Sequence, residues 1–331
     1  MKTTWIQHIR RIFIFLIGGL VFAACEKEEL PIPPVDRGGV KTFQAEMGNN
    51  YENQLWIDIE SGEIISSQNR YTWDIAFEGS GENGFVFLNG AKMVRAALSD
   101  KSWEETTAST GLTFSIDASN GRTDSLVIGD WKSHKKIIVI DKGYTAEGRP
   151  AGYVKLELIS LTGGKYTFRY ANLNGSSEQA QEISVNADYN TLMYSFDEHK
   201  LLNHQPKKNE YDLFFTQYAT HLYETGSTTP TDYLVNGALL NPTNVLALYL
   251  PEESFENVTE DILSSVTLSN QQDAIGYDWK SYNFDTGTYV VNSKKTFLVQ
   301  DRKGFVYKMH FIDFYNNKGE KGTPTVEYQK L

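Results

Sequence analysis

Apolar and polar residues alternate with a period of two in many segments of this chain. Polar or small residues separate Trp73, Ile75 and Phe77, and the stretch 165–170 alternates in the same way. Alternation places every second side chain on one face, which is typical of a β-strand. The stretch 252–263 instead has apolar residues at helical spacing. The pattern therefore predicts an all-β protein of antiparallel sheets, with at most one or two short helices.

The most distinctive predicted hairpin occurs twice, in Leu55–Phe77 and in Leu192–Phe215. In both copies an alternating segment ends at an acidic residue and an aliphatic pair follows. A polar loop then leads to an aromatic-Asp-aliphatic-x-Phe strand. The copies are 137 residues apart before the loop and 138 after it. Asp74 and Asp212 occupy the same position beside strand aromatics, so we expect both carboxylates to make structural hydrogen bonds.

The similarity continues in order to the end of the chain. Asn89-Gly90-Ala91 matches Asn236-Gly237-Ala238 at an offset of 147, and Asp130-Trp131-Lys132 matches Asp278-Trp279-Lys280 at 148. Collinear matches with small insertions indicate a tandem duplication. We therefore expect two antiparallel sheet domains of one topology, at 40–172 and 182–331, joined by a polar linker at 173–181. Trp73 and Tyr211 should then occupy equivalent core positions.

The first 24 residues have the pattern of a targeting segment. Basic residues precede an apolar run of thirteen residues, which is too short to span a bilayer. The run ends at Cys25 after Ala23-Ala24, which resembles the lipobox of bacterial lipoproteins, although Phe22 stands where that pattern usually has Leu. We predict a lipoprotein signal peptide at 1–24 and lipidation of Cys25. The alternative is a simple secretory signal with an incidental cysteine.

Residues 25–39 are expected to form an extended tether, because prolines and glycines follow a short charged run. That run, Glu26-Lys27-Glu28-Glu29, resembles the surface-export signal of Bacteroidetes lipoproteins, and a solvated charge run is the alternative. We therefore expect an outer-membrane lipoprotein that is exposed at the cell surface and held to the membrane by its lipid anchor.

Charge and cysteine count disfavour several functions. The chain has 31 basic and 42 acidic residues, and removal of 1–24 deletes three basic residues, which leaves 28 against 42. Such an acidic surface repels phosphate backbones, so we expect no nucleic-acid partner. With Cys25 lipidated, no thiol remains for a disulfide or a nucleophile. The sequence also has no nucleophile elbow, zinc-protease motif or phosphate loop, so we do not expect an enzyme.

Several motifs together resemble the HmuY family of Bacteroidetes haem-binding lipoproteins. They are SGEIIS at 61–66, WDIAF at 73–77, IGYDW at 275–279, GFVYKMHF at 304–311 and KGEKG at 318–322. The resemblance implies an all-β, hand-like sheet assembly that captures haem for nutrient acquisition. It also implies a TonB-dependent outer-membrane receptor as a partner.

The resemblance further implies that paired His or paired Met side chains hold the haem iron. The corresponding segments here are 284–287 and roughly 243–274, and neither contains a His or a Met. Haem is therefore a possible cofactor only through other ligands. No other cofactor is indicated.

The remaining candidates for ligand contact are one histidine and three aromatic residues. His221, in an insertion of the second copy beside Tyr218 and Tyr223, is the best single histidine, and the identity of any metal stays open. Tyr282, Phe284 and Tyr289 could stack on a flat ring. His310 is expected to be solvated and Met93 to fill the core. The alternative function is a non-enzymatic surface scaffold that binds a protein or a glycan.

Overall fold

The computed structural model describes residues 38–331 except 204, 224 and 252. The predicted signal peptide, Cys25 and nearly all of the tether lie outside the described residues. The described residues belong to one compact unit, Arg37–Leu331. Within this part of the chain, the structure contains no helix with the length and apolar character needed to cross a membrane.

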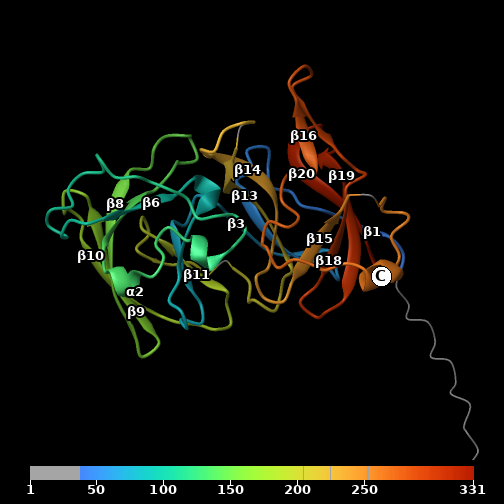
Figure 1. The fold of residues 1–331 in the computed structure, drawn as a ribbon. Coiled ribbons are helices and arrows are strands. Elements are labelled where there is room, and N and C mark those ends of the chain that lie inside the picture. Colours follow the sequence, from blue (N-terminus) through green and yellow to red (C-terminus); the bar gives the residue numbers. More distant parts are fainter. Residues whose placement is uncertain (1–37, 204, 224, 252) are drawn as a thin grey trace, which may run out of the picture. The chain divides into compact units, whose positions relative to one another are not determined.

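The predicted all-β fold is confirmed. Two large five-stranded sheets lie at opposite ends of this unit, with two small four-stranded sheets between them (Figure 1). Large sheet 1 has the order β1 (Lys41–Gln44), β20 (Lys321–Lys330), β19 (Val306–Tyr315), β18 (Thr296–Gln300) and β15 (Leu246–Leu250). Large sheet 2 has the order β10 (Gln179–Ser184), β9 (Lys165–Asn172), β8 (Tyr153–Thr162), β7 (Ile137–Asp141) and β6 (Arg95–Ser99).

The small sheets and a separate hairpin complete the strands. Small sheet 1 has the order β14 (Thr231–Leu240), β13 (Leu213–Leu222), β2 (Asn53–Asp58) and β3 (Glu63–Asn69). Small sheet 2 has the order β12 (Lys200–Leu201), β11 (Thr191–Ser195), β4 (Ile75–Glu78) and β5 (Val86–Leu88). The separate hairpin consists of β16 (Lys280–Asn283) and β17 (Thr288–Val291). The described helices are short: α2 (Trp131–His134) and the 3-10 turns η1 (Gly90–Lys92), η2 (Thr123–Ser125) and η3 (Glu260–Ser264).

The segment with helical spacing forms only the 3-10 turn η3. Its residues Phe255 and Val258 are buried, whereas Ile262 and Leu263 are partly buried. Val258 packs with Leu298 on the outer face of large sheet 1, and Phe255 stacks on His310 with 4.2 Å between ring centroids. We had expected His310 to be solvated, but the structure shows that it is buried. Its ring nitrogens lie 2.8 Å from the Ser293 carbonyl oxygen and 2.9 Å from Glu327 Oε2. Strand alternation predicted the face correctly but could not show that a loop covers it.

The strand orders of the two copies correspond one to one. If β2 to β9 are matched in order with β11 to β15 and β18 to β20, the two large sheets have the same order and so do the two small sheets. Strands β1 and β10 occupy the same edge position in their large sheets. The copies therefore share one topology, and the hairpin β16–β17 has no counterpart in the first copy.

The expected boundaries between the copies are wrong, because the copies exchange strands. Strand β2 of the first copy pairs with β13 of the second, β11 of the second pairs with β4 of the first, and β1 pairs with β20. The expected linker at 173–181 is the turn of the β9–β10 hairpin together with the start of β10. Neither 40–172 nor 182–331 thus completes its own sheets, and the unit consists of two interlocked halves.

Each half has its own hydrophobic core, and a smaller cluster joins them. One core combines residues 43–59 with residues 213–328, and the other lies within residues 75–201. The joining cluster contains Trp73 and Tyr211, the predicted equivalents, together with Trp56, Ala76 and Met193. Both predicted residues are buried, at the junction of the halves rather than in separate cores.

Candidate functional site

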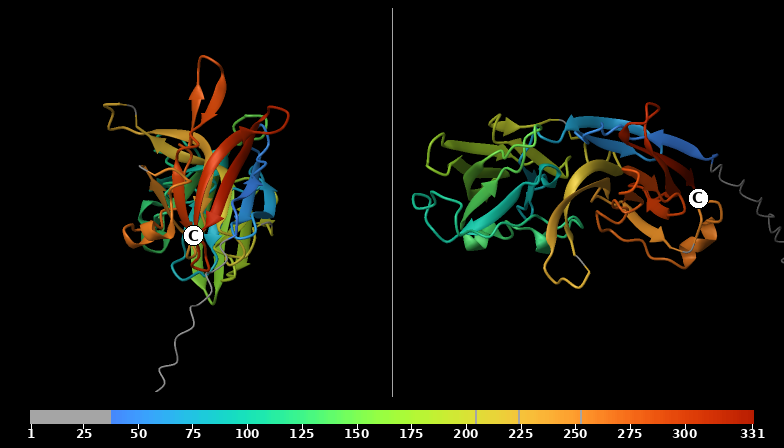
Figure 2. Two further views of the ribbon diagram at one scale, coloured as in Figure 1. Left: turned by 90° about the vertical axis from the view of Figure 1, so that its right-hand side faces the viewer. Right: turned by 90° about the horizontal axis from the view of Figure 1, so that it is seen from above.

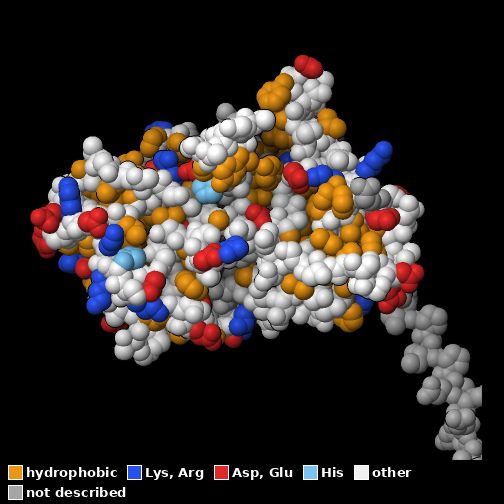
Figure 3. Space-filling view, viewed as in Figure 1, with side chains coloured by type: hydrophobic (Ala, Val, Ile, Leu, Met, Phe, Trp, Pro, Cys, Tyr) orange, Lys and Arg blue, Asp and Glu red, His pale blue; other side chains and the backbone are white. Residues whose placement is uncertain are grey.

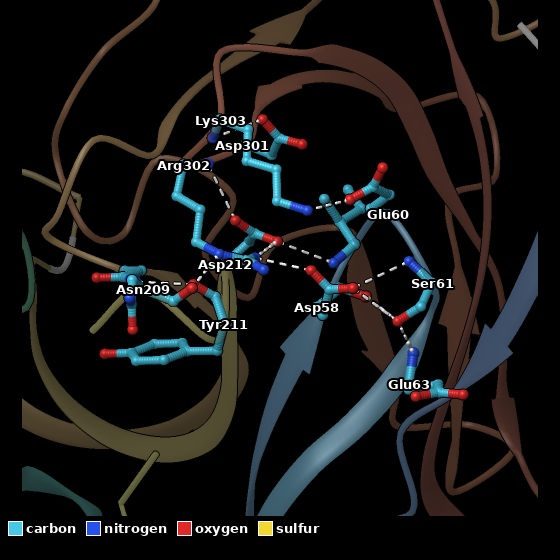
Figure 4. A network of polar contacts seen from close by, with 12 residues as sticks. Asp58, Glu60, Ser61, Glu63, Asn209, Tyr211, Asp212, Asp301, Arg302 and Lys303 are labelled. Carbon is cyan, nitrogen blue, oxygen red and sulfur yellow. Dashed lines mark hydrogen bonds and ion pairs between the residues drawn. The ribbon is translucent and has the colours of Figure 1, made fainter. Parts of the chain in front are cut away.

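Two buried carboxylates hold the exchanged hairpins in place. Asp212 Oδ2 accepts a hydrogen bond from the Ile59 backbone N–H at 3.0 Å and lies 2.7 Å from Arg302 Nη1 (Figure 4). Asp74 accepts from the Phe196 backbone N–H at 2.7 Å and lies 2.6 Å from Lys92 Nζ. Each aspartate therefore fixes the hairpin turn of the other copy, which agrees with the structural role we expected.

The charges around Asp212 form a small network. Arg302 also contacts Asp58 Oδ1 at 2.7 Å, and Lys303 pairs with Glu60 (Figure 4). Burial opposes ionisation of Asp58, but hydrogen bonds from Ser61 and Arg302 outweigh it and lower the Asp58 pKa. Burial raises the pKa of Asp212 in spite of Arg302. In the other half, Lys142 pairs with Asp197 as Lys303 does with Glu60. The network ties the β2–β3 turn to the start of β13 and to the turn between β18 and β19, and so joins small sheet 1 to large sheet 1.

A cleft of about 680 Å³ opens between the two small sheets. Its lining includes Trp56, Phe214 and Leu239, which are directly opposite one another on β2, β13 and β14. It also includes Phe87 on β5 and Met193 on β11, which both pair with Ala76 of β4. The cleft thus lies between equivalent faces of the two halves, whereas the opposite faces pack into the two cores.

Aromatic rings and amides dominate this lining. Phe214 stacks on Trp56 with 4.6 Å between ring centroids, and Phe87 and Phe214 are only half-buried. Trp73 Nε1 donates to Gln54 Oε1 at 2.8 Å, and Gln54 Nε2 donates to Thr216 Oγ1 at 2.8 Å. The Trp73 indole and the Gln54 amide are therefore satisfied within the wall, and partly exposed apolar ring faces are left for a ligand. The aromatic lining residues are Trp56, Trp73, Phe85, Phe87, Tyr189, Tyr211, Phe214 and Tyr218.

The ionisable residues of the lining are mainly acidic: Glu78, Glu82 and Asp117, with Lys208 as the basic member. Asp117 accepts backbone hydrogen bonds from Leu88 at 2.8 Å and Val127 at 2.9 Å. Burial nevertheless raises its pKa to about 6, because desolvation outweighs those two bonds. Near neutral pH the cleft carries net negative charge.

The cleft supplies few groups that could ligate haem iron. Among the described residues that line it there is no histidine, and Met193 is its one methionine. The Met193 sulfur already accepts from Gln68 Nε2 at 3.0 Å. Burial raises the pKa of Tyr211 to about 12 and that of Tyr218 well above the ordinary value, so neither provides a phenolate near neutral pH. These residues fit a flat ring but do not fit paired axial ligation of iron.

The three predicted aromatic residues do come together on the hairpin β16–β17. The Tyr282 ring lies 5.1 Å from both the Phe284 and the Tyr289 ring centroids, and Phe284 is 87% exposed. The hairpin projects from the unit (Figures 1 and 2), and apolar side chains gather on it (Figure 3). Tyr282, Phe284 and Tyr289 are absent from the cleft lining, so the structure places them apart from the cleft.

His221 lies near the end of β13, where its Nδ1 is 3.0 Å from Asp232 Oδ1 on the neighbouring strand. It too is absent from the cleft lining. In the described part of the chain, no group of three or more His, Cys, Asp and Glu residues is arranged to hold a metal.

Residues Trp56, Phe87 and Phe214 were missed as candidates. The sequence could have indicated them, because the repeated strands carry apolar residues on both faces. A strand with one face towards solvent carries apolar residues on the other face only.

The fold and the site define a class of all-β proteins with two interlocked halves and an aromatic cleft between them. The chain belongs to the HmuY family: the model of the HmuY protein family matches residues 50–328. No curated protein matches the chain.

Solved structures that resemble the chain are distant. Apo PinO from Porphyromonas gingivitis is 10% identical, with 89% of this chain and 98% of that chain covered and a TM-score of 0.34. The apo HmuY analog (TFO) of Tannerella forsythia is 11% identical over the same shares, with a TM-score of 0.26. A protein from Bacteroides vulgatus described as HmuY-like and heme-binding is 15% identical, with 53% and 90% covered and a TM-score of 0.18.

Proposed function

We propose that this HmuY-family protein captures haem or a porphyrin-like ring in the cleft between its two halves. The observation that carries the proposal is the 680 Å³ cleft with an aromatic lining contributed by both halves. Pockets of roughly 300–1,000 Å³ lined by apolar and aromatic side chains are typical of small-molecule sites. Family membership supports haem or a related tetrapyrrole as the ligand class.

Ring stacking, rather than iron ligation, holds the ligand in this proposal. Phe214 already stacks on Trp56, and Phe87 faces the cleft from the other half, so a flat ring can extend the existing stack. Bound haem would supply redox-active iron, but the lining offers no pair of axial ligands for it. Iron should therefore contribute little affinity, and metal-free porphyrin should bind about as tightly as haemin.

The proposal is tested by titrating the purified protein with haemin and with protoporphyrin IX, followed by absorbance and by ring fluorescence. Phe214→Ala should weaken both ligands about tenfold or more. Phe284→Ala, on the projecting hairpin, is the matched control and should leave both affinities unchanged. Sharp low-spin haem bands, or loss of binding in Phe284→Ala alone, would contradict stacking in the cleft. The second result would instead support Tyr282, Phe284 and Tyr289 as the ligand contacts, and His221→Ala tests the remaining candidate.

We further propose that Cys25 is lipidated and anchors the protein to the outer membrane, exposed at the cell surface, where it binds rather than transforms its ligand. The lipobox-like sequence before Cys25 supports this proposal. Durable attachment requires more than one acyl chain, which lipoprotein processing provides. Cys25→Ala should release the protein from membranes. Continued fractionation with membranes would contradict the anchor.

The projecting hairpins support a second candidate function, contact with a protein partner such as a TonB-dependent receptor. Five of the exposed large apolar residues lie on the hairpins β13–β14 and β16–β17. The hairpin β13–β14 is longer than its counterpart β4–β5, the hairpin β16–β17 has no counterpart in the first copy, and both project from the unit (Figure 2). Exposed apolar patches mark interaction surfaces. The residues are Tyr223, Tyr233, Tyr282, Phe284 and Val290.

This second candidate is tested with a double variant, Tyr282→Ser with Phe284→Ser. Growth on haem as the iron source should fall while porphyrin affinity of the purified protein stays the same. A photo-crosslinker at position 284 should form an adduct with an outer-membrane barrel protein in cells. Unchanged growth together with absence of that adduct would exclude a receptor contact through this hairpin.

A further inference from the structure

A second, smaller pocket of about 250 Å³ lies on the far side of Tyr218, between β13, β15, β18 and the loop 273–278. We call it the Tyr218 pocket. Its walls include Tyr218, Tyr249, Phe297, Asp273, Gly276 and Asp278. None of these except Tyr218 lines the large cleft. The pocket is therefore a separate feature with its own chemistry.

The hydroxyl group of Tyr218 is the first sign that the pocket receives a ligand. Tyr218 is only 5% exposed, yet its buried Oη has no hydrogen-bond partner among the described residues. A buried hydroxyl without a partner has lost its hydration and gained no hydrogen bond in return, so such groups usually mark a missing partner. Burial raises the pKa of the Tyr218 phenol well above its ordinary value, and the charges of Asp273, Tyr277 and Asp278 raise this pKa further.

The backbone leaves room at this point. Gly276 has a φ of +68°, in the left-handed region that favours glycine. A Cβ added there would lie 3.8 Å from Tyr218 Oη and 3.1 Å from the Asp273 carbonyl oxygen. Glycine thus keeps open a space bordered by the Tyr218 hydroxyl and a main-chain carbonyl group. Both groups can accept hydrogen bonds from a donor placed between them.

The charge of the pocket favours a cation. Ser119 Oγ donates to Asp273 Oδ2 at 2.6 Å and so orients this carboxylate, which makes no ion pair within the described residues. Asp278, in contrast, is already paired with Lys295 at 2.6 Å. The Lys295 ammonium group also lies 4.8 Å from the Tyr249 ring centroid. The rim therefore already holds one ammonium group between a carboxylate and an aromatic face.

We propose that the Tyr218 pocket binds a small organic ammonium ion, a protonated primary amine. The Asp273 carboxylate neutralises the charge of the ammonium group, and Tyr218 Oη accepts a hydrogen bond from one of its N–H groups. The rings of Tyr249 and Phe297 cover the aliphatic part of the ligand. Aromatic faces attract cations through their quadrupole, and the 5.6 Å between these two ring centroids makes them one continuous wall. The inference goes beyond the proposed function, because it concerns a different pocket and a ligand of opposite charge.

The test titrates the purified full chain with n-butylammonium chloride at pH 7, followed by backbone amide NMR shifts, with 1-butanol as the neutral probe. Butylammonium should shift the amides of the loop 273–278 saturably, and 1-butanol should not. Tyr218→Phe and Asp273→Asn should each weaken binding at least tenfold. Asp278→Asn is the matched carboxylate control and should weaken it less than threefold, because Lys295 already pairs with Asp278.

The inference would be overturned by equal shifts with 1-butanol, by unchanged affinity in Tyr218→Phe, or by equal losses in Asp273→Asn and Asp278→Asn. Potassium chloride that saturates the same amides in an Asp273-dependent way would assign the pocket to an inorganic cation instead. Tyr218→Phe removes only an unpartnered hydroxyl, so its melting temperature should equal or exceed that of the parent protein. Porphyrin titration of the same variants reports separately on the large cleft.

Discussion

At the scale of single residues, the repeat was easier to recognise than to align. Asn89 Nδ2 donates to the Trp73 carbonyl oxygen at 2.8 Å, and Asn241 Nδ2 donates to the Tyr211 carbonyl oxygen at 2.7 Å. The structural counterpart of Asn89 is thus Asn241, whereas the sequence match had indicated Asn236. The hairpin β13–β14 is longer than its counterpart β4–β5, so the equivalent asparagine lies five residues later. The chance recurrence of Asn-Gly-Ala at 236–238 hid this shift in the sequence comparison.

The first prediction concerns the buried pair Asp74 and Lys92, which are 1% and 3% exposed. Removal of one partner from a buried ion pair leaves an uncompensated charge and costs about 3–5 kcal/mol. Asp74→Ala should lower the free energy of unfolding by this amount in urea, and addition of Lys92→Met should restore part of it. Asp188→Ala, which breaks the exposed pair with Lys207, should cost less than about 1 kcal/mol. Equal losses in the two single variants would contradict the role of Asp74.

The second prediction concerns Lys280, which is buried beside the Trp279 ring, with its Nζ 4.0 Å from the ring centroid. Burial lowers the pKa of Lys280 to about 7. Above that pH the unfolded chain binds a proton that the folded protein does not, so stability should rise from pH 7 towards pH 10. Lys280→Met should raise the melting temperature at pH 7 and flatten this rise. Lys132→Met, at the exposed counterpart, should change neither, and a persistent rise in Lys280→Met would assign it to another group.

At the scale of elements, strands were predictable and their partners were not. Alternation around Trp73 and around Phe168 correctly indicated strands β4 and β9. Pairing within one copy and pairing between copies satisfy the same alternation, because each places the same faces inward. The choice depends on contacts distant in sequence, such as Asp212 with the Ile59 backbone. The exchange of hairpins was therefore absent from the sequence-based prediction.

The exchange changes the expected effect of a core substitution. If the two copies were separate domains, Trp73→Ala would melt the first copy with less effect on the second. Because Trp73 packs with Trp56, Met193 and Tyr211 at the junction, its truncation should instead destabilise both halves together, by about 3–5 kcal/mol. Calorimetry should show one cooperative transition at a lower temperature. Two separated transitions would contradict interlocked halves.

At the scale of the whole molecule, family and fold class could be read from motifs, but the site could not. The candidates Tyr282, Phe284 and Tyr289 were chosen because the resemblance implied a ligand near them, and they do form an exposed aromatic group. The cleft forms only when equivalent faces of both halves meet, with Trp56 and Phe214 opposite Phe87 and Met193. A prediction based on two separate domains could not bring those faces together.

The net charge of the cleft gives a prediction about ligand preference. In the proposed complex, porphyrin carboxylates would meet Glu78, Glu82 and Asp117, with Lys208 as the basic lining residue. Glu82 is exposed, so Glu82→Lys can reverse one charge without disturbing the core. It should tighten protoporphyrin IX binding several-fold at low salt, and the gain should shrink at high salt. Glu182→Lys, which lies outside the cleft lining, is the control and should have no effect. Weaker binding in Glu82→Lys would contradict this account of the cleft.

The most direct test of the central claim is a crystal structure of the protein with bound protoporphyrin IX. Our account predicts that the ring lies between the two small sheets, against Phe214 on one side and Phe87 on the other, with no side chain at the ring centre from a His or Met pair. A ring bound instead between the projecting hairpins, against Tyr282 and Phe284, would contradict it.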